Sequence, residues 1–181
     1  MHPPAAFVYG SLMWEPVLRA MLGRVPKATS ACIEAGFKRC RVRNEPYPGL
    51  VRTSEPVKAT HGLLLTDLVG AERAIFDLFE DVEGEVYTAR AVEARIVVGV
   101  MSPYGWATST AHREVSALAL GETVQASLYL FGDSSALLPE LWAPDDFASH
   151  LPTFLAMVER FALEPAVAKL RLAAQDELSK L

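Results

Sequence analysis

The chain has 181 residues, of which 51% are hydrophobic and 22% are charged, and its formal net charge is −5. This composition is typical of a globular protein, and the length suits one domain with a substantial core. The negative charge gives no electrostatic basis for binding nucleic acid or an anionic membrane. We therefore expect a single domain over residues 1–181, present as a monomer or a homodimer, with neither nucleic acid nor a membrane as a partner.

Other classes of protein are disfavoured by local patterns. The longest apolar runs, such as HGLLLTDLVG, are too short to cross a bilayer, and the start MHPPAAFVYG lacks the regions of a signal peptide. Cys32 and Cys40 make no disulfide framework, and no Cys/His cluster has the spacing of metal ligands. We expect a cytoplasmic protein that needs no metal and no cofactor.

The first predicted element is a short strand at Phe7 and Val8, followed by a loop over residues 9–14. Pro16 suits the first helical position, and apolar residues at helical spacing continue until Gly23 ends the helix. Further along, IEAGFKRCRVRNEPYPGLVRT predicts a strand, a turn at residues 44–49 and a second strand.

Three arginines alternate along the first strand of that predicted hairpin. They are Arg39, Arg41 and Arg43, which period-2 geometry places on one face. We interpret this face as solvated rather than as an anion site.

HGLLLTDL predicts a buried strand that leads into a helix capped by Thr66 or Asp67. Apolar residues recur along the helix at intervals of three and four, which forms a packing stripe; they are Leu68, Ala71, Ile75 and Phe79. Glu80 falls about 40° beyond Phe76, at the edge of this stripe on the last turn.

Two long alternating strands follow, over residues 92–98 and 124–131. The connection over residues 100–121 is long for a hairpin loop, so it either extends both strands or covers a site. From Pro139 onward the pattern becomes helical, with one helix capped by Asp145 or Asp146 and another opened by Pro165. We expect the apolar stripe of the last helix to pack on the body of the protein rather than on a second copy. The fold class is α+β, with a mostly antiparallel sheet.

The stretch Tyr9-Gly10-Ser11-Leu12 is the first candidate site. A glycine lets the backbone approach a ligand closely, and consecutive N–H groups of such a loop can surround an anion. The alternative is a tight turn from strand to helix, with a packed tyrosine.

Glu80 is the second candidate. A carboxylate in the last turn of a helix faces the negative end of the dipole, and Asp81, Glu83 and Glu85 add like charges. Partial burial beside neighbouring phenylalanines would raise its pKa into the range that a general acid/base near neutral pH requires. The alternative is a solvated, acid-rich helix end.

Together, VYGSL, GFKRCRVRNEPYPGLV, HGLLL and FDLFEDVEGEVYTARAVEA resemble the γ-glutamylcyclotransferase-like family, in particular its branch of plant avirulence-induced proteins and bacterial relatives. The likeness covers roughly residues 6–131 and, more loosely, the segment DDFASHLPTFLAMVERF. It implies a small mixed, mostly antiparallel β-barrel with flanking helices as the core, over residues 5–135. A C-terminal helical extension would follow over residues 136–181.

The resemblance also implies a catalytic residue, which is Glu80. Glu83 and Glu85 compete for this role because the spacing before Tyr87 is longer than usual in the family, but Glu80 follows the expected Asp77-Leu78-Phe79 pattern. A set of aromatic, small and apolar residues would contact the substrate; the set is Phe7, Val8, Tyr9, Gly10, Ser11, Leu12, Tyr87 and Tyr129, with Tyr47 and Pro48 in a further matching segment.

The activity that the resemblance implies is the release of 5-oxoproline and a free amine or amino acid from a γ-glutamyl compound. The substrate's own α-amine would attack the γ-carbonyl, with Glu80 as general acid/base, so the enzyme would be an acyl-transferring lyase. The alternatives are a non-catalytic module that binds a small carboxylate ligand, and a serine amidase using Ser11, which is disfavoured because Ser11 lies outside a GxSxG motif. The leaving group stays open, and residues 100–121 are expected to influence it.

Overall fold

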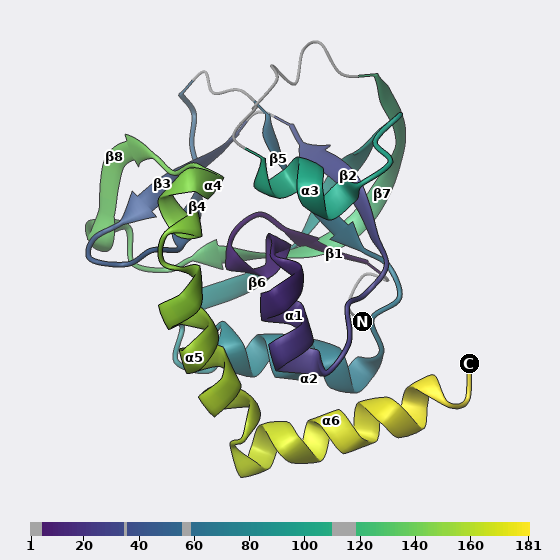
Figure 1. Ribbon diagram of the computed structural model, residues 1–181. Coiled ribbons are helices and arrows are strands. Elements are labelled where there is room, and N and C mark those ends of the chain that lie inside the picture. Colours follow the sequence, from purple (N-terminus) through teal and green to yellow (C-terminus); the bar gives the residue numbers. More distant parts are fainter. Residues whose placement is uncertain (1–4, 35, 56–58, 110–118) are drawn as a thin grey trace.

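Five strands of the computed structural model close into a barrel in the order β1-β5-β2-β6-β7 (Figure 1). The structure describes residues 5–34, 36–55, 59–109 and 119–181. Neighbouring strands pair antiparallel except β1 and β7, which are parallel. The expected α+β fold with a small, mostly antiparallel barrel is therefore confirmed. The barrel strands are β1 (Ala5–Val8), β2 (Ala28–Ile33), β5 (Thr60–Leu65), β6 (Tyr87–Val97) and β7 (Leu120–Phe131).

A second sheet of three strands has the order β4-β3-β8. Strands β3 (Phe37–Val42) and β4 (Pro48–Arg52) form the predicted antiparallel hairpin. Strand β8 (Leu137–Leu141) pairs with β3 and was not predicted; it lies in the segment assigned to the helical extension.

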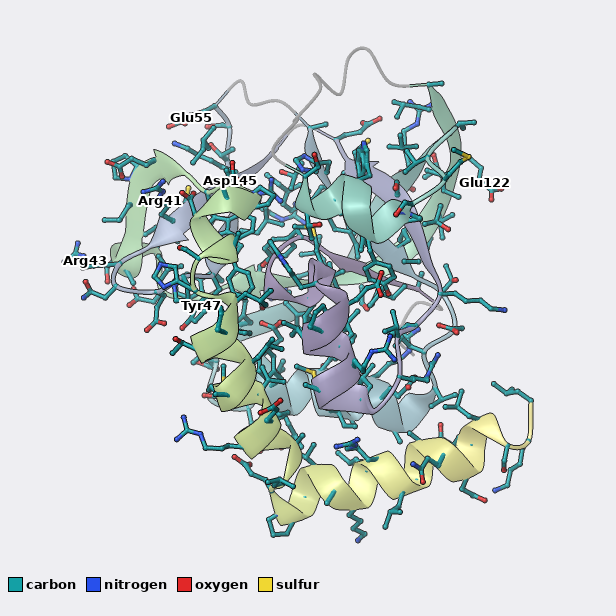
Figure 2. All side chains as sticks on the ribbon, viewed as in Figure 1. Arg41, Arg43, Tyr47, Glu55, Glu122 and Asp145 are labelled. Atoms are coloured by element: carbon teal, nitrogen blue, oxygen red, sulfur yellow. The ribbon has the colours of Figure 1, made fainter. Side chains whose placement is uncertain are left out.

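The interpretation of Arg39, Arg41 and Arg43 as one solvated face is wrong for Arg39. Arg41 and Arg43 are exposed, and Arg43 lies at the outer edge of the molecule (Figure 2). Arg39, in contrast, is only 8% exposed. Its guanidinium lies 5.0 Å from the ring centroid of Trp142, which follows β8, and donates to the carbonyl of Tyr9, so it faces the interior rather than solvent.

Helices flank the barrel, with α1 lying in front of it in Figure 1. Pro16 is the second residue of α1, and Gly23 ends this helix with a φ of 82°, in the left-handed region that glycine adopts without strain. None of the helices in the described part of the chain is long and apolar enough to cross a membrane. The helices are α1 (Glu15–Leu22), α2 (Gly70–Phe79), α3 (Pro103–Thr108), α4 (Pro144–Ala148), α5 (Leu151–Ala162) and α6 (Pro165–Leu178), with short 3₁₀ turns η1 (Ser11–Met13) and η3 (Ser134–Ala136).

The start of α2 differs from the expectation, because its N-cap is Val69 rather than Thr66 or Asp67. The Asp67 carboxylate instead accepts the backbone N–H of Lys27 at 2.8 Å and pairs with Arg24 at 2.9 Å. The Asp67 side chain therefore makes polar contacts with a distant segment of the chain and does not cap α2.

Helix α6 packs on α2, so the expectation of packing on the body of the protein is confirmed. Val167 and Ala174 are buried, and the carboxylate of Glu177 accepts the N–H of Ala71 near the start of α2 at 3.4 Å. Leu181, the last residue of the predicted stripe, is 94% exposed and takes no part.

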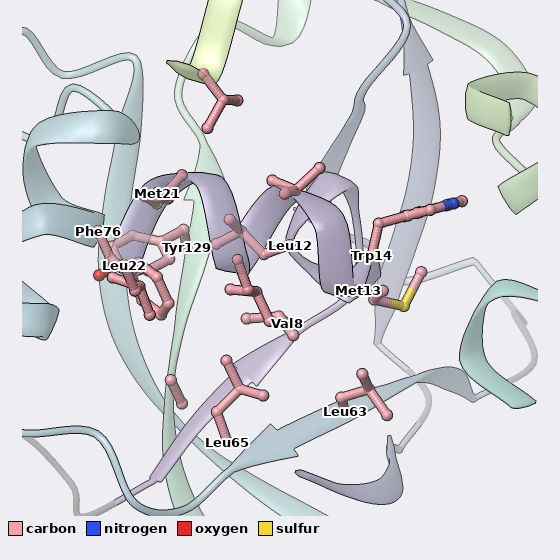
Figure 3. Packing of buried hydrophobic residues seen from close by; sticks show 14 of the residues in the cluster. Val8, Leu12, Met13, Trp14, Met21, Leu22, Leu63, Leu65, Phe76 and Tyr129 are labelled. Atoms are coloured by element: carbon pink, nitrogen blue, oxygen red, sulfur yellow. The ribbon is translucent and has the colours of Figure 1, made fainter. Parts of the chain in front are cut away.

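The main hydrophobic cluster lies between the barrel and the helices, where side chains of β1 and β5 meet those of α1 and α2 (Figure 3). A second hydrophobic cluster contains buried side chains from one face of each barrel strand. This packing fixes the end of β1 and the end of α2, which carry the two candidate sites.

Candidate active site

The loop after β1 lies tightly against the start of β4. A Cβ added to Gly10 would meet two ring carbons of Pro48 at 3.0 Å, so a glycine is what allows this approach. The carbonyl of Gly10 accepts the N–H of Met13 as η1 begins. The N–H groups of Ser11 and Leu12 have no acceptor among the described residues, as expected for the first turn of a helix.

Three tyrosines near this loop have hydroxyl groups that donate hydrogen bonds within the protein. Tyr9 donates its hydroxyl proton to the carbonyl of Tyr129. Tyr87 donates to the carbonyl of Pro48 at 3.0 Å, and Tyr129 donates to Oδ1 of Asp77 at 2.7 Å. Each hydroxyl is thus engaged, so these side chains have fixed orientations, and burial raises the pKa of all three.

Glu80 caps the carboxyl end of α2, with its backbone N–H bonded to the carbonyl of Phe76 at 2.9 Å. It is partly buried, and burial raises the pKa of its carboxyl from 4.5 to about 8, with a further contribution from the charge of Asp77. The carboxyl therefore exchanges its proton near neutral pH, as a general acid/base must. Glu83 and Glu85 are both exposed and do not line the cavity described next.

The loop and the carboxyl open onto one cavity of about 260 Å³. Every residue that the sequence predicted for substrate contact or catalysis lines it, together with Tyr47 and Pro48. Most of the remaining lining is apolar. The lining residues are Phe7, Val8, Tyr9, Gly10, Ser11, Leu12, Tyr47, Pro48, Leu78, Phe79, Glu80, Asp81, Val86, Tyr87, Tyr129, Phe154, Met157 and Phe161.

Sequence reasoning missed the wall that α5 contributes. Phe154, Met157 and Phe161 line the cavity, whereas none of the described residues from 100 to 121 does so. Part of that expected region, residues 110–118, lies outside the described residues. Phe154 and Phe161 are seven residues apart, which indicates a shared helix face but not what the face covers.

Arg39 lies beneath the loop and was also missed. Its Nη1 donates to the carbonyl of Tyr9 at 2.8 Å and to that of His61 at 3.4 Å. Burial lowers the pKa of this guanidinium to about 10, so it stays cationic at neutral pH. The arginine thereby holds the start of the loop in place and adds positive charge behind it.

This cavity is large enough for a small ligand and combines three properties. It offers backbone N–H groups for an anionic or partly charged oxygen, a carboxyl that exchanges a proton near pH 8, and an apolar wall. Ser11 is 7% exposed, and no histidine in the described part of the chain lines the cavity to activate its hydroxyl. The site is therefore suited to proton transfer on a bound acyl compound rather than to serine nucleophilic catalysis.

The chain and its barrel are also similar to known proteins. Residues 6–146 match the family described as gamma-glutamyl cyclotransferase, AIG2-like, and the chain belongs to this family. AIG2-like protein D of Arabidopsis thaliana is 37% identical over 87 residues, which are 47% of this chain and 53% of the relative. The chain thus spans about half the length of this curated relative.

Solved structures show the same fold. A gamma-glutamyl cyclotransferase superposes with a TM-score of 0.53 at 12% identity, covering 92% of this chain and 85% of its own. An Arabidopsis thaliana protein known from a solution structure gives a TM-score of 0.51 at 21% identity, covering 91% and 87%. At these identities the likeness establishes the fold alone.

Proposed function

We propose that this protein is a γ-glutamylcyclotransferase that releases 5-oxoproline and a free amine or amino acid from a γ-glutamyl compound. The observation that carries the proposal is that the Glu80 carboxyl and the Tyr9–Leu12 loop open onto the same cavity. Family membership supports this class of activity.

The reaction needs no nucleophile from the protein. The α-amine nitrogen of the substrate attacks the γ-carbonyl carbon, a C–N bond closes the five-membered ring, and the original amide C–N bond breaks. Holding the substrate folded brings the reacting ends together, and such proximity contributes as much as about 7–11 kcal/mol in favourable intramolecular cases.

In this proposal Glu80 carries the proton between the two nitrogens. As a carboxylate it accepts the proton of the attacking amine, and as the acid it returns that proton to the leaving nitrogen, so no external acid or base is consumed. Its pKa of about 8 makes both forms accessible near neutral pH. The N–H groups of Ser11 and Leu12 hold either the substrate carboxylate or the developing oxyanion.

The test is the Glu80→Gln variant, which keeps the size of the side chain but cannot take up a proton. We expect its rate of 5-oxoproline release, measured by chromatography with mass detection, to fall by about 10²–10⁴-fold. Glu83→Gln is the matched control, because Glu83 is exposed and outside the cavity; it should retain the wild-type rate. A folded Glu80→Gln variant with the wild-type rate would remove the assignment, and ligand binding without any product in the wild type would indicate a binding module.

A further inference from the structure

Arg39 carries a buried positive charge that no carboxylate of the described residues neutralises. Its Nη1 donates to the carbonyls of Tyr9 and His61, and its guanidinium lies over the ring of Trp142. None of the ion pairs that the described residues form includes Arg39, although the residue is only 8% exposed. Burying an ion without an opposite charge costs free energy. An anion bound nearby would offset this cost.

The Tyr9–Gly10 peptide connects this charge to the cavity. Tyr9 and Gly10 line the cavity, whereas Arg39 does not. The C=O and N–H groups of a trans peptide point in opposite directions, so the contact between Arg39 and the Tyr9 carbonyl turns the Gly10 N–H away from the guanidinium. This N–H group has no acceptor among the described residues, and the same is true of those of Ser11 and Leu12. Three consecutive donors of one loop can therefore surround an anion.

The charge of Arg39 also acts on the wall of the cavity. Burial and the charge of Glu80 raise the pKa of the Tyr9 hydroxyl, whereas the charge of Arg39 lowers it. The described residues that line the cavity include no lysine, arginine or histidine. An anion held by the loop thus depends on the peptide N–H groups and on the cation behind them, which acts through the protein interior rather than through water.

We propose that Arg39 is a positioning residue that, through the Tyr9–Gly10 peptide, holds the α-carboxylate of the γ-glutamyl half of the substrate in the loop. The inference rests on the proposed function, because γ-glutamyl compounds carry this carboxylate whatever their leaving group. The bound carboxylate supplies the negative charge that the buried guanidinium lacks. Arg39 therefore governs the affinity for the substrate, whereas Glu80 carries the proton.

The first experiment uses two probes that differ in one charge. 5-Oxoproline carries the carboxylate, and 5-oxoprolinamide is its neutral amide; calorimetric titration gives both dissociation constants. Arg39→Met replaces the cation by a neutral side chain, and we expect it to weaken the binding of 5-oxoproline at least about tenfold more than that of the amide. The ratio of the two constants cancels any displacement of the loop that affects both probes. An unchanged ratio, or a wild type that binds neither probe, would overturn the inference.

Further variants separate the charge of Arg39 from its packing. Arg39→Lys keeps a cation on an unbranched stem, so the ratio should stay within about threefold of the wild-type value. Arg39→Gln is a second neutral variant and should change the ratio as Arg39→Met does. Arg43→Met is the matched control, because Arg43 is exposed at the outer edge of the molecule, and it should leave the ratio unchanged. Equal ratios in Arg39→Lys and Arg39→Met would contradict a role for the charge.

Kinetics with γ-glutamyl-methylamide and γ-glutamyl-alanine distinguish the two proposals. We expect Arg39→Met to raise KM at least about tenfold and to lower kcat much less, because the carboxylate is held equally in the ground state and the transition state. A fall in kcat without a loss of affinity for 5-oxoproline would assign the charge to the oxyanion and overturn the inference, while the cyclotransferase proposal would stand. Charge-dependent binding of 5-oxoproline, without its release from any γ-glutamyl compound, would support the inference on Arg39 and overturn the cyclotransferase proposal.

Discussion

At the scale of single residues, the chemistry of the cavity depends on the protonation of Glu80. Its pKa is 4.5 in an unfolded chain and about 8 in the folded protein, chiefly because of burial. Below pH 4.5 the carboxyl is protonated in both states. Between pH 4.5 and 8 the unfolded state binds fewer protons, so the contribution of this group to the free energy of unfolding is lost as the pH rises through the folded pKa.

The Glu80→Gln variant should therefore lose less stability with rising pH than the wild type. The amide resembles the neutral acid, so at pH 8 we expect the variant to be more stable than the wild type by more than about 1 kcal/mol, and at pH 4 to differ little. Urea unfolding at both pH values measures this. A parallel decline of the two proteins would mean that Glu80 does not ionise in a buried setting.

After burial, the charge of Asp77 is the second cause that raises the pKa of Glu80, and the Asp77 carboxylate also accepts the hydrogen bond of the Tyr129 hydroxyl. The Asp77→Asn variant removes the charge while an amide oxygen still accepts that hydrogen bond. The pKa of Glu80 should fall, so the acidic limb of the kcat/KM profile should move to lower pH. Glu83→Gln, which removes an exposed charge nearby in sequence, should leave the profile unmoved. An unshifted limb in Asp77→Asn would contradict electrostatic coupling between the two carboxyls.

At the scale of elements, Arg24 connects the end of α1 to the start of α2. Its guanidinium binds both oxygens of Glu72 at 2.6 Å, and Glu72 is only 1% exposed. Arg24→Met should lower the free energy of unfolding by about 3 kcal/mol, because it leaves a buried carboxylate without its cation. The double variant Arg24→Met/Glu72→Gln should recover part of this loss in denaturant titrations. An Arg24→Met variant as stable as the wild type would show that the Arg24–Glu72 ion pair makes no net contribution to the free energy of unfolding.

Elements with a regular apolar period could be predicted from the sequence, and those that depend on distant pairing could not. Alternation identified β6 and β7, and Gly23 marked the end of α1. Strand β8 has the sequence LLPEL with three exposed residues, so it carries no period-2 signal and exists through its pairing with β3. Asp67 suited a helix cap locally, but Arg24, 43 residues earlier, binds it instead.

At the scale of the whole molecule, the cavity is assembled from segments that are far apart in the chain. The sequence allowed the loop at Gly10 and the carboxyl of Glu80 to be predicted as parts of one site, because their residue types and order resemble a family. It did not allow the α5 wall to be predicted, since the apolar face of a helix shows that it is buried but not against what. The position of Phe154 and Phe161 beside Phe79 in the cavity wall follows only from the folded chain.

Because the barrel, α2 and α5 all line the cavity, a ligand bound there should stabilise the chain as one unit. In the Glu80→Gln variant, a γ-glutamyl compound at about 100 times its Kd adds about 2.7 kcal/mol to the free energy of unfolding. For a chain of this length the Tm should rise by about 5–10 °C, in a single calorimetric transition. Glutamine at the same concentration is the control for the γ-glutamyl half alone and should give a smaller shift. Two transitions, of which only one responds to the ligand, would contradict the single domain expected over residues 1–181, because residues 136–181 would then unfold apart from the barrel.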